Sequence, residues 1–471
     1  MTPGFDLVVI GGGPAGASGA LAAAMFGKRV ALVEKEEHVG GAGINTGTVP
    51  SKALRESALL MSGWRARKLL GVDLSLRSGA TVADLTRHEV GVRNTIRFDI
   101  EHRMRQHGVV RFHGTAAFVD PHTVRVVDPS GAETLLRGEK ILVATGSSPM
   151  RPPEFPFEHP RVHDSNEILE IAELPKSLAV VGAGVVGAEY ACTFAALGIE
   201  VHLIDGRDTL LPFLDHDVSK AITAAMTLSG IVFHWKERVV ACDAPASGDV
   251  ALSLTSGERL GVSDVLVAAG RSSNTDDLNL PAAGLVPGPR GLIVVNDMFQ
   301  SSVAHIYAAG DVVGPPALAA TGAEQARVAV CHALELIEKV SATLLPTGIY
   351  TIPEASMVGM TEQAARDAGI DCVIGRADYA ENPRGRLIGD DRGFLKLVLQ
   401  ASDLAILGVH AVGDQATELI HIGLIAMLGG ATADLFNRAC FNYPTLGDLY
   451  KYAAYDAMLK GMLPTAKPVD S

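Results

Sequence analysis

Residues 6–16 read DLVVIGGGPAG, a short apolar run that passes directly into a glycine-rich turn. An alanine-rich stretch continues as far as Gly27, and a second apolar run, RVALV at residues 29–33, ends at Glu34. This order predicts a strand, a helix and a parallel strand, and uninterrupted apolar runs are typical of a parallel sheet covered on both faces. The turn has the G-x-G-x-x-G spacing of a dinucleotide-binding unit, with its glycines at Gly11, Gly13 and Gly16.

Such glycines permit a tight turn, close approach of a pyrophosphate and close packing of the helix on the strand. The helix N-terminus would offer N–H groups and a positive dipole to the phosphates, and Glu34 would accept hydrogen bonds from a ribose diol. For a single copy of this motif, a tight turn without any ligand is the alternative.

The same pattern occurs a second time. Apolar residues 178–181 lead into GAGVVG at 182–187, and the run EVHLI at 200–204 ends at Asp205. In both copies the acid stands 18 residues after the last glycine of the turn. Such a repeat is far harder to obtain by chance than one motif, so the sequence predicts two bound nucleotides. The glycines of the second copy are Gly182, Gly184 and Gly187.

The residues that follow the second copy bear on the choice of nicotinamide nucleotide. Asp205 suits a ribose 2′-hydroxyl and would favour NAD, whereas Arg207, with Arg271 as a helper, could pair with the 2′-phosphate of NADP. The presence of both indicates tolerance of either nucleotide. A solvated turn is the alternative for Arg207.

Three further apolar runs end in small residues. They lead into Ala144-Thr145-Gly146, Ala268-Ala269-Gly270 and Ala308-Ala309-Gly310-Asp311. Small residues at the carboxyl ends of strands let the backbone approach a ligand closely.

The pattern changes after about residue 345. Residues 394–400 and 405–412 are expected to form an antiparallel pair, followed by helices near 414–428, 431–438 and 445–461. No nucleotide fingerprint occurs there, so a third domain of a different kind is predicted. Residues 465–471 are expected to form a frayed tail.

Composition excludes several classes of function. The 471 residues carry a formal charge of −13, which argues against binding to nucleic acid or an anionic membrane. The five cysteines are widely spaced, so neither a disulfide framework nor a metal site is predicted, and a reducing cytoplasm is the expected compartment. Residues 177–204 are apolar enough to suggest a membrane span, but their glycines and two carboxylates favour a buried strand–turn–helix–strand.

Residues 40–52, GGAGINTGTVPSK, are the most informative stretch. Here the chain resembles the pyridine nucleotide–disulfide oxidoreductases, the group of dihydrolipoamide dehydrogenase and glutathione reductase, over essentially its whole length. The resemblance implies an α/β fold with two doubly wound, Rossmann-like FAD- and NAD(P)-binding domains and an α+β C-terminal dimerisation domain. The implied segments are 1–150 and 274–344 for FAD, 151–273 for NAD(P) and 345–471 for a homodimer interface.

The reaction chemistry of that family is missing from this sequence. The family's two redox cysteines would fall at Gly43 and Thr48, and the C-terminal histidine and glutamate that its partner subunit supplies would fall at Tyr443 and Asp448. Glycine has no nucleophile, and a tyrosine with a pKa near 10 is a poor base at neutral pH. The sequence therefore excludes disulfide chemistry. Thr445 and Asp448 have a structural alternative, a capping box for the final helix.

The resemblance also implies the residues that hold the cofactors. Lys52 and Glu189 match a family pair beside flavin N5, Asp311 a residue at the ribityl chain, and Gly114 a backbone contact to adenine. Exposed helix-surface charges, and a helix N-cap for Asp311, are the alternatives. Lys52, Glu189 and Tyr443 are the catalytic candidates. The implied FAD residues are Gly11, Gly13, Gly16, Glu34, Lys35, Gly41, Gly43, Thr48, Lys52, Gly114, Thr145, Gly146, Asp311 and Ala319; those for NAD(P) are Gly182, Gly184, Gly187, Glu189, Asp205, Arg207 and Gly270.

A reduced flavin with nicotinamide on one face and no thiol on the other has few acceptors to which it can pass its electrons. The stretches 47–55, 346–354, 418–423 and 441–445 resemble the soluble pyridine nucleotide transhydrogenase branch of the family. The resemblance implies hydride transfer from NADPH to NAD⁺ through flavin N5. Two alternatives stay open: an NAD(P)H dehydrogenase that reduces a quinone, dye or oxygen, and a non-catalytic redox sensor.

Overall fold

The computed structural model describes residues 4–63, 69–70, 72–73, 75, 81–336 and 344–462. The first glycine fingerprint lies at the centre of a seven-stranded sheet with the order β3-β2-β1-β6-β5-β4, and β17 pairs with β6. The strands β3, β2, β1, β6 and β17 pair in parallel, whereas β4 and β5 form an antiparallel extension on the long strand β6. The strands are β1 Gly4–Ile10, β2 Val30–Glu34, β3 Val110–His113, β4 Thr115–Asp120, β5 Thr123–Val127, β6 Glu133–Val143 and β17 Ile306–Ala308.

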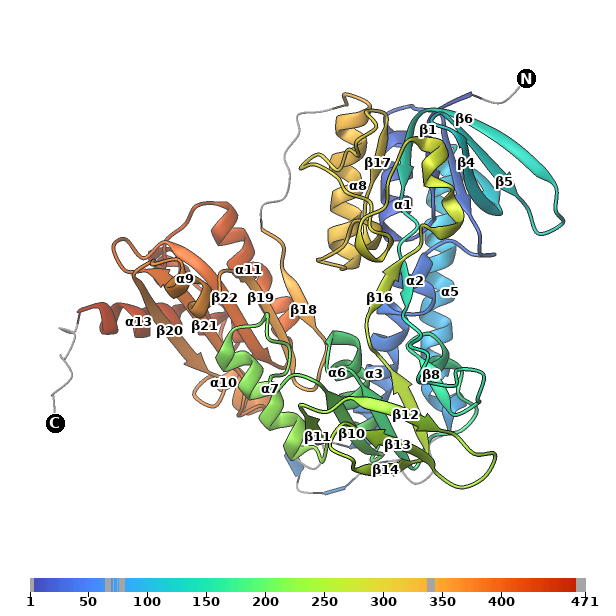
Figure 1. The fold of residues 1–471 in the computed structure, drawn as a ribbon. Coiled ribbons are helices and arrows are strands. Elements are labelled where there is room, and N and C mark those ends of the chain that lie inside the picture. Colours follow the sequence, from blue (N-terminus) through green and yellow to red (C-terminus); the bar gives the residue numbers. More distant parts are fainter. Residues whose placement is uncertain are drawn as a thin grey trace.

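Helices flank this sheet (Figure 1). The alanine-rich helix α1 packs on α8, and buried Ala20, Ala23 and Ala326 belong to one core cluster, because alanine lets two helices approach closely. The seven-stranded sheet and its helices form the first lobe, and the sheet that contains the second fingerprint forms the second lobe. Helices α3 and α5 pack on each other and run from the first lobe toward the second (Figure 1). The helices are α1 Pro14–Met25, α2 Gly41–Asn45, α3 Thr48–Ser62, α5 Val82–Gln106 and α8 Ala319–Ala333.

The second fingerprint builds another parallel sheet, with the order β11-β10-β9-β15-β8. A three-stranded antiparallel sheet, β12-β13-β14, lies beside it, and the antiparallel pair β7–β16 joins this lobe to the first one. The elements are β7 Ser147–Pro149, β8 Val162–Asp164, β9 Ser177–Val181, α6 Val185–Ala196, β10 Glu200–Asp205, α7 His216–Leu228, β11 Val232–Trp235, β12 Val239–Asp243, β13 Val250–Leu254, β14 Arg259–Val262, β15 Asp264–Val267 and β16 Arg271–Ser273.

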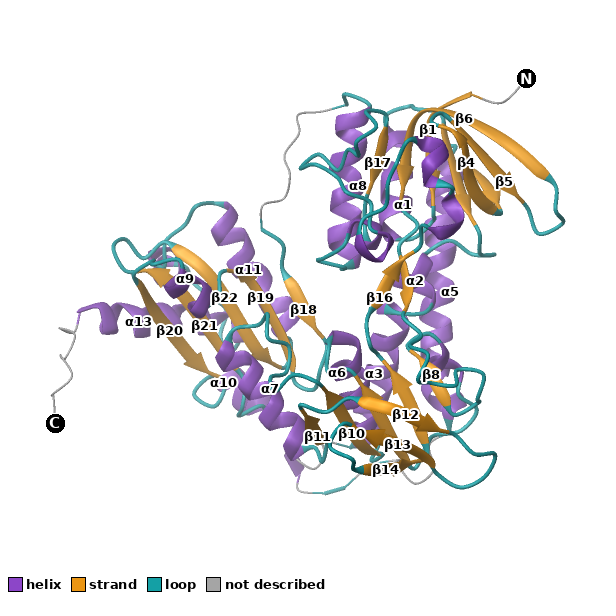
Figure 2. Cartoon of the chain, viewed as in Figure 1, coloured by secondary structure: helices purple, strands orange, loops and turns teal. Residues whose placement is uncertain are grey.

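The C-terminal part is an antiparallel sheet with the order β18-β19-β22-β21-β20 and helices α9 to α13 (Figure 2). The predicted antiparallel pair is confirmed as β21 and β22. The elements are β18 Thr347–Ile349, β19 Glu354–Gly359, α9 Glu362–Asp367, β20 Cys372–Asp378, α10 Pro383–Ile388, β21 Phe394–Gln400, β22 Ile406–Gly413, α11 Ala416–Leu428, α12 Asp434–Arg438 and α13 Leu449–Met462. Short 3-10 turns complete the chain at Glu167–Glu170, Asp276–Leu278, Leu280–Ala283, Pro289–Gly291, Asp311–Val313 and Leu446–Asp448.

The core of the second lobe is shared with its neighbours. Leu178 and Phe194 of this lobe belong to one buried cluster with Leu54 from α3 and with Ile349 and Phe394 from the C-terminal sheet. Helix α3 therefore couples all three parts of the fold.

The apolar stretch 177–204 folds as β9, α6 and β10, and within the described ranges no helix combines the length and apolar character that a membrane span needs. The predicted capping box is wrong: the Thr445 hydroxyl donates to the carbonyl of Asn442, because a separate 3-10 turn intervenes before α13. The tail at 465–471 lies outside the described residues, and the domain boundaries stay a prediction.

Candidate nucleotide-binding and redox site

The two glycine turns have the same backbone geometry. Gly11 and Gly182 have φ of +100° and +105°, and a Cβ on them would collide with the carbonyl oxygens of Ala144 and Ala268. A Cβ on Gly16 would overlap the Gly11 carbonyl oxygen, and one on Gly187 would overlap that of Gly182. Both turns therefore require glycine at the first and third positions.

The two acids also occupy equivalent places. The Gly12 amide donates to Glu34 Oε2 and the Ala183 amide donates to Asp205 Oδ2, both at 2.7 Å. The two carboxylates are buried, with residue exposures of 6% and 9%. Each acid thus closes its own turn at the carboxyl end of the second strand.

Both helix N-termini are left open by their own residues. Gly13 and Gly184 are the N-caps of α1 and α6, and neither helix has a side-chain cap. A Cβ on Gly184 would meet nothing within 4 Å, and Gly13 faces the backbone of Gly41. N–H groups without a side-chain cap at two helix ends are suited to bind the phosphates of two dinucleotides.

The remaining first-lobe candidates are near the first turn. The Gly114 amide donates to the Glu34 carbonyl at 2.9 Å, and a Cβ on Gly43 would lie 3.9 Å from that of Ala319, the first residue of α8. Among the described residues, Thr145 Oγ1 is buried and has no hydrogen-bond partner. An unpartnered buried hydroxyl costs stability unless a ligand supplies the missing bond, so its position fits a cofactor site.

Asp311 does not cap a helix. It accepts a hydrogen bond from the Ser147 hydroxyl at 2.7 Å, and the N-cap of the following 3-10 turn is Gly310. Three further candidates are placed as follows: Lys35 has an exposed side chain after β2, Gly146 has φ of +69° and Gly270 has φ of +119°.

Lys52 and Glu189 form a close ion pair between α3 and α6. Lys52 Nζ lies 2.5 Å from Glu189 Oε2, and their side chains are 25% and 8% exposed. The exposed-charge alternatives for these two residues are therefore wrong. Lys52 follows Thr48, which begins α3, and Glu189 lies in the first turns of α6.

Sequence reasoning missed Tyr350 as part of this cluster. Its amide donates to Glu189 Oε1 at 2.9 Å, and its ring centroid lies 4.9 Å from Lys52 Nζ, a cation–π distance. The only sequence signal was its place in the stretch 346–354. Burial raises the pKa of Tyr350, so its ring stays neutral over the pair.

Tyr443 is not brought to this cluster within one chain. It is 74% exposed, and among the described residues its side chain has no hydrogen bond, ion pair or ring contact. The resemblance assigned this position to the partner subunit, so its role stays a prediction.

Arg207 is tied to Asp205 in a bidentate pair, with Nε and a terminal nitrogen 2.8 and 2.7 Å from the two carboxylate oxygens. Burial would raise the pKa of Asp205, but the hydrogen bonds from Arg207 and from the Ala183 amide outweigh it and lower that pKa. The expectation for Arg271 is wrong: it donates to Ser147 at 2.7 and 2.6 Å and lies 3.9 Å from Asp311, because β16 leads back to the first lobe.

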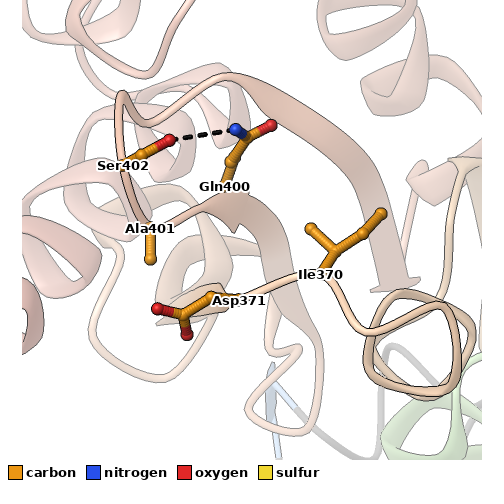
Figure 3. A pocket seen from close by; sticks show the side chains of 5 residues that line it. All are labelled: Ile370, Asp371, Gln400, Ala401 and Ser402. Atoms are coloured by element: carbon orange, nitrogen blue, oxygen red, sulfur yellow. Dashed lines mark hydrogen bonds between the residues drawn. The ribbon is translucent and has the colours of Figure 1, made fainter.

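Residues 40–52, which include Lys52, contain no cysteine. The five cysteines of the chain are all free thiols. Within the described ranges, no group of three or more His, Cys, Asp or Glu side chains is arranged to hold a metal ion. A surface hollow of about 460 Å³ lies at the β21–β22 turn, where Gln400 donates to Ser402 (Figure 3). None of the predicted site residues lines it.

Two equivalent dinucleotide turns on separate parallel sheets, with a lysine–glutamate ion pair that joins α3 to α6, define a two-nucleotide oxidoreductase fold. Residues 5–333 match the pyridine nucleotide-disulphide oxidoreductase family, and residues 345–454 match the dimerisation domain of that family. The chain belongs to this family.

Two curated relatives are named soluble pyridine nucleotide transhydrogenase. One from Mycobacterium bovis is 43% identical over 460 residues, covering 97% of each chain. One from Escherichia coli is 37% identical over 470 residues, covering 96% of this chain and 98% of the other.

Solved structures share the fold. The LpdA structure from Mycobacterium tuberculosis superposes with a TM-score of 0.89 at 25% identity, covering 95% of this chain and 99% of that one. The HOCl-induced flavoprotein disulfide reductase RclA from Escherichia coli gives a TM-score of 0.85 at 27% identity, covering 94% of this chain and 99% of that one.

Proposed function

We propose that the chain is an FAD-dependent NAD(P) transhydrogenase, which converts NADPH and NAD⁺ into NADP⁺ and NADH without a redox disulfide. The carrying observation is the Lys52–Glu189 pair, with a half-buried lysine and a buried glutamate, retained where the two cysteine positions of the reaction loop are Gly43 and Thr48. The names of the curated relatives support the same reaction.

The residues of the first turn fit FAD, and those of the second fit a nicotinamide nucleotide. Gly11, Gly13 and Gly16 would leave the α1 N-terminus free for the FAD pyrophosphate, and Glu34 would face the ribose. The unpartnered Thr145 hydroxyl supports a ligand beside this turn. When bound, FAD supplies two-electron redox chemistry between the two nicotinamide nucleotides.

Lys52 would place a fixed positive charge beside the flavin ring. The low exposure of Glu189 strengthens its attraction for Lys52, and the Tyr350 amide holds the second carboxylate oxygen. Such a preorganised cation stabilises negative charge that develops nearby without further reorganisation. Glu189 and Tyr350 are positioning residues for Lys52.

We also propose a homodimer and a cytoplasmic location. The match of residues 345–454 to a dimerisation domain supports self-association, and the exposed Tyr443 would meet its site only across such an interface. Five free, scattered cysteines suit a reducing compartment.

Anaerobic stopped-flow reduction of the FAD-loaded protein by NADPH tests the proposal. Lys52→Met should slow flavin bleaching by about 10²-fold or more, as loss of a preorganised charge does, while FAD stays bound. Lys220→Met, an exposed lysine on α7, is the matched control and should reduce at the wild-type rate. Unchanged bleaching in Lys52→Met would contradict the role of the pair.

Steady-state turnover identifies the acceptor. NADPH is paired with thio-NAD⁺, with a quinone and with lipoamide, and thiols are titrated before and after reduction. The proposal expects turnover with thio-NAD⁺ and no new thiols. Faster turnover with the quinone would indicate a dehydrogenase, turnover with lipoamide would indicate disulfide chemistry, and a flavin that does not bleach would indicate a sensor.

A further inference from the structure

Three cations gather where β10 and β11 end, beside the second nucleotide turn. Arg207 follows β10, and Lys236 and Arg238 follow β11. The two loops run side by side, because the amides of Lys236 and Glu237 donate to the carbonyls of Arg207 and Asp205 at 3.0 and 3.2 Å.

Two of these cations already have carboxylate partners. Arg207 holds Asp205 through two hydrogen bonds, and Lys236 Nζ lies 3.2 Å from Asp208. The Asp205 carboxylate is buried, so removal of Arg207 would leave its negative charge without a counter-ion. Among the described residues, the Ala183 amide and the amides of its own loop would then be its remaining donors, and such an uncompensated buried charge destabilises the fold.

Arg238 is different. Within the part of the chain that the structure describes, its guanidinium has no ion pair and no hydrogen bond. The neighbouring Glu237 does not supply one, because its Oε2 accepts from the Thr255 hydroxyl at 2.6 Å and from the Ser256 amide at 3.0 Å.

Gly206 leaves the space in which the Arg238 side chain lies. A Cβ on Gly206 would stand 2.9 Å from Arg238 Nε and 3.6 Å from Cζ, so a larger residue would force the guanidinium away. Gly206 stands between Asp205 and Arg207, the residues that sequence analysis associated with the ribose 2′ position. An unpaired guanidinium thus lies directly beside that position.

We propose that Arg238 binds the 2′-phosphate of NADP(H), while Arg207 remains on Asp205 as its counter-ion. A phosphate dianion that pairs with Arg238 breaks no existing ion pair, and a guanidinium can offer two parallel N–H donors to phosphate oxygens. A phosphate that drew Arg207 away would expose the buried Asp205 carboxylate to a second anion. With NAD(H), the same Asp205 would keep an oxygen near the ribose hydroxyl.

This inference rests on the proposed use of both nucleotides, but its test requires no turnover. Binding of adenosine 2′,5′-bisphosphate and of ADP to the FAD-loaded protein is measured by calorimetry at fixed ionic strength. Arg238→Gln should weaken binding of the bisphosphate about tenfold or more, as loss of a charged hydrogen bond does, and should change ADP affinity less than twofold. Lys236→Gln, an exposed cation on the same loop with a carboxylate partner, should change the affinity of neither probe more than threefold.

Arg207→Gln separates the two arginines. It should weaken both probes, because the buried Asp205 loses its cation. Selective loss of the bisphosphate in Arg207→Gln, with no loss in Arg238→Gln, would overturn the proposal, as would equal loss of both probes in Arg238→Gln. A wild-type protein that binds ADP but not the bisphosphate would overturn it too. A selective effect of Arg238→Gln in a protein that fails to transfer hydride would uphold this inference and refute the transhydrogenase instead.

Discussion

Lys396 is the most completely buried cation among the described residues, and Lys396→Met should destabilise the fold markedly. Its side chain is 2% exposed, and Nζ lies 2.8 Å from Asp215, 2.6 Å from Asp217 and 2.7 Å from Glu362. The lysine lies in β21 and two of its partners lie at the start of α7, so the network joins the C-terminal sheet to the second lobe.

The magnitude follows from this burial. Removal of one partner from a buried pair costs about 3–5 kcal/mol, because the remaining charge is left uncompensated. Asp215 is 1% exposed, and in Lys396→Met its carboxylate would keep, of the residues that the structure describes, only the amides of Asp217 and Glu362 as donors. An unfolding entropy of about 2.1 cal/mol/K per residue gives about 1 kcal/mol/K for 471 residues, so the thermal midpoint should fall by about 3–5 °C.

Calorimetry of the FAD-loaded protein at pH 7.5 measures this change. Lys460→Met is the matched control, because Lys460 Nζ lies 2.6 Å from Asp456 but its side chain is 51% exposed. A surface pair of this kind contributes about 0.3–0.5 kcal/mol, so this midpoint should move by less than about 1 °C. Equal shifts in the two variants would refute the reasoning that burial, rather than the contact itself, sets the cost.

Three further predictions concern pH, the glycine turn and the thiols. Burial alone would raise the pKa of Asp215, but hydrogen bonds from Lys396 and the Glu362 amide lower it. This stabilisation is therefore present above the unfolded carboxyl pKa of about 4 and is lost as the pH falls further. Burial lowers the pKa of the neighbouring His410. The gap between wild type and Lys396→Met should therefore stay at its full size from pH 7.5 down to about pH 5 and shrink as the pH falls below about 4. A gap that widens in acid would contradict this. Gly187→Ala should lower the free energy of unfolding by about 1–3 kcal/mol or more, because its Cβ would overlap the Gly182 carbonyl oxygen. Gly184→Ala is the control and should keep the wild-type midpoint in thermal unfolding, because its Cβ would meet no atom within 4 Å. Equal midpoints for the two variants would contradict the geometry. In the native protein, Cys440 should react first with an aromatic disulfide reagent, because its thiol is exposed. Cys192 should react slowly, because burial raises the pKa of its thiol to about 12. Cys440→Ser should therefore remove the fast phase of the reaction.

Much of the fold could be predicted from short stretches of sequence. Gly16 is required by the local backbone, because its Cβ would overlap the Gly11 carbonyl oxygen, and Gly11 has a positive φ. The following acid closes the same turn, so the spacing of these residues carried the information. The repeat at Gly182 and Asp205 confirmed this logic with the same hydrogen bond. The antiparallel pair after residue 394 likewise follows from local alternation and a short turn.

The contacts that join distant segments could not be predicted in this way. Glu189 meets Lys52 across 137 residues and Tyr350 across 161 residues, and no periodicity states which of these side chains face one another. The Lys52–Glu189 pair was found through family resemblance, whereas Tyr350 was missed. The predicted capping box at Thr445 was wrong, because the prediction took the final helix to begin directly after Thr445. Instead a 3-10 turn, Leu446–Asp448, lies between Thr445 and α13.

The lysine–glutamate pair has a consequence for how this chain could be divided. Lys52 comes from the first lobe and Glu189 from the second, whereas Tyr350 directly follows β18 of the C-terminal sheet. A fragment that ended before residue 345 would retain both fingerprints yet leave one oxygen of the carboxylate without its donor. The capacity to hold nucleotides is therefore modular and could survive excision, but the electrostatic setting for their reaction belongs to no single module and exists only in the uncut polypeptide.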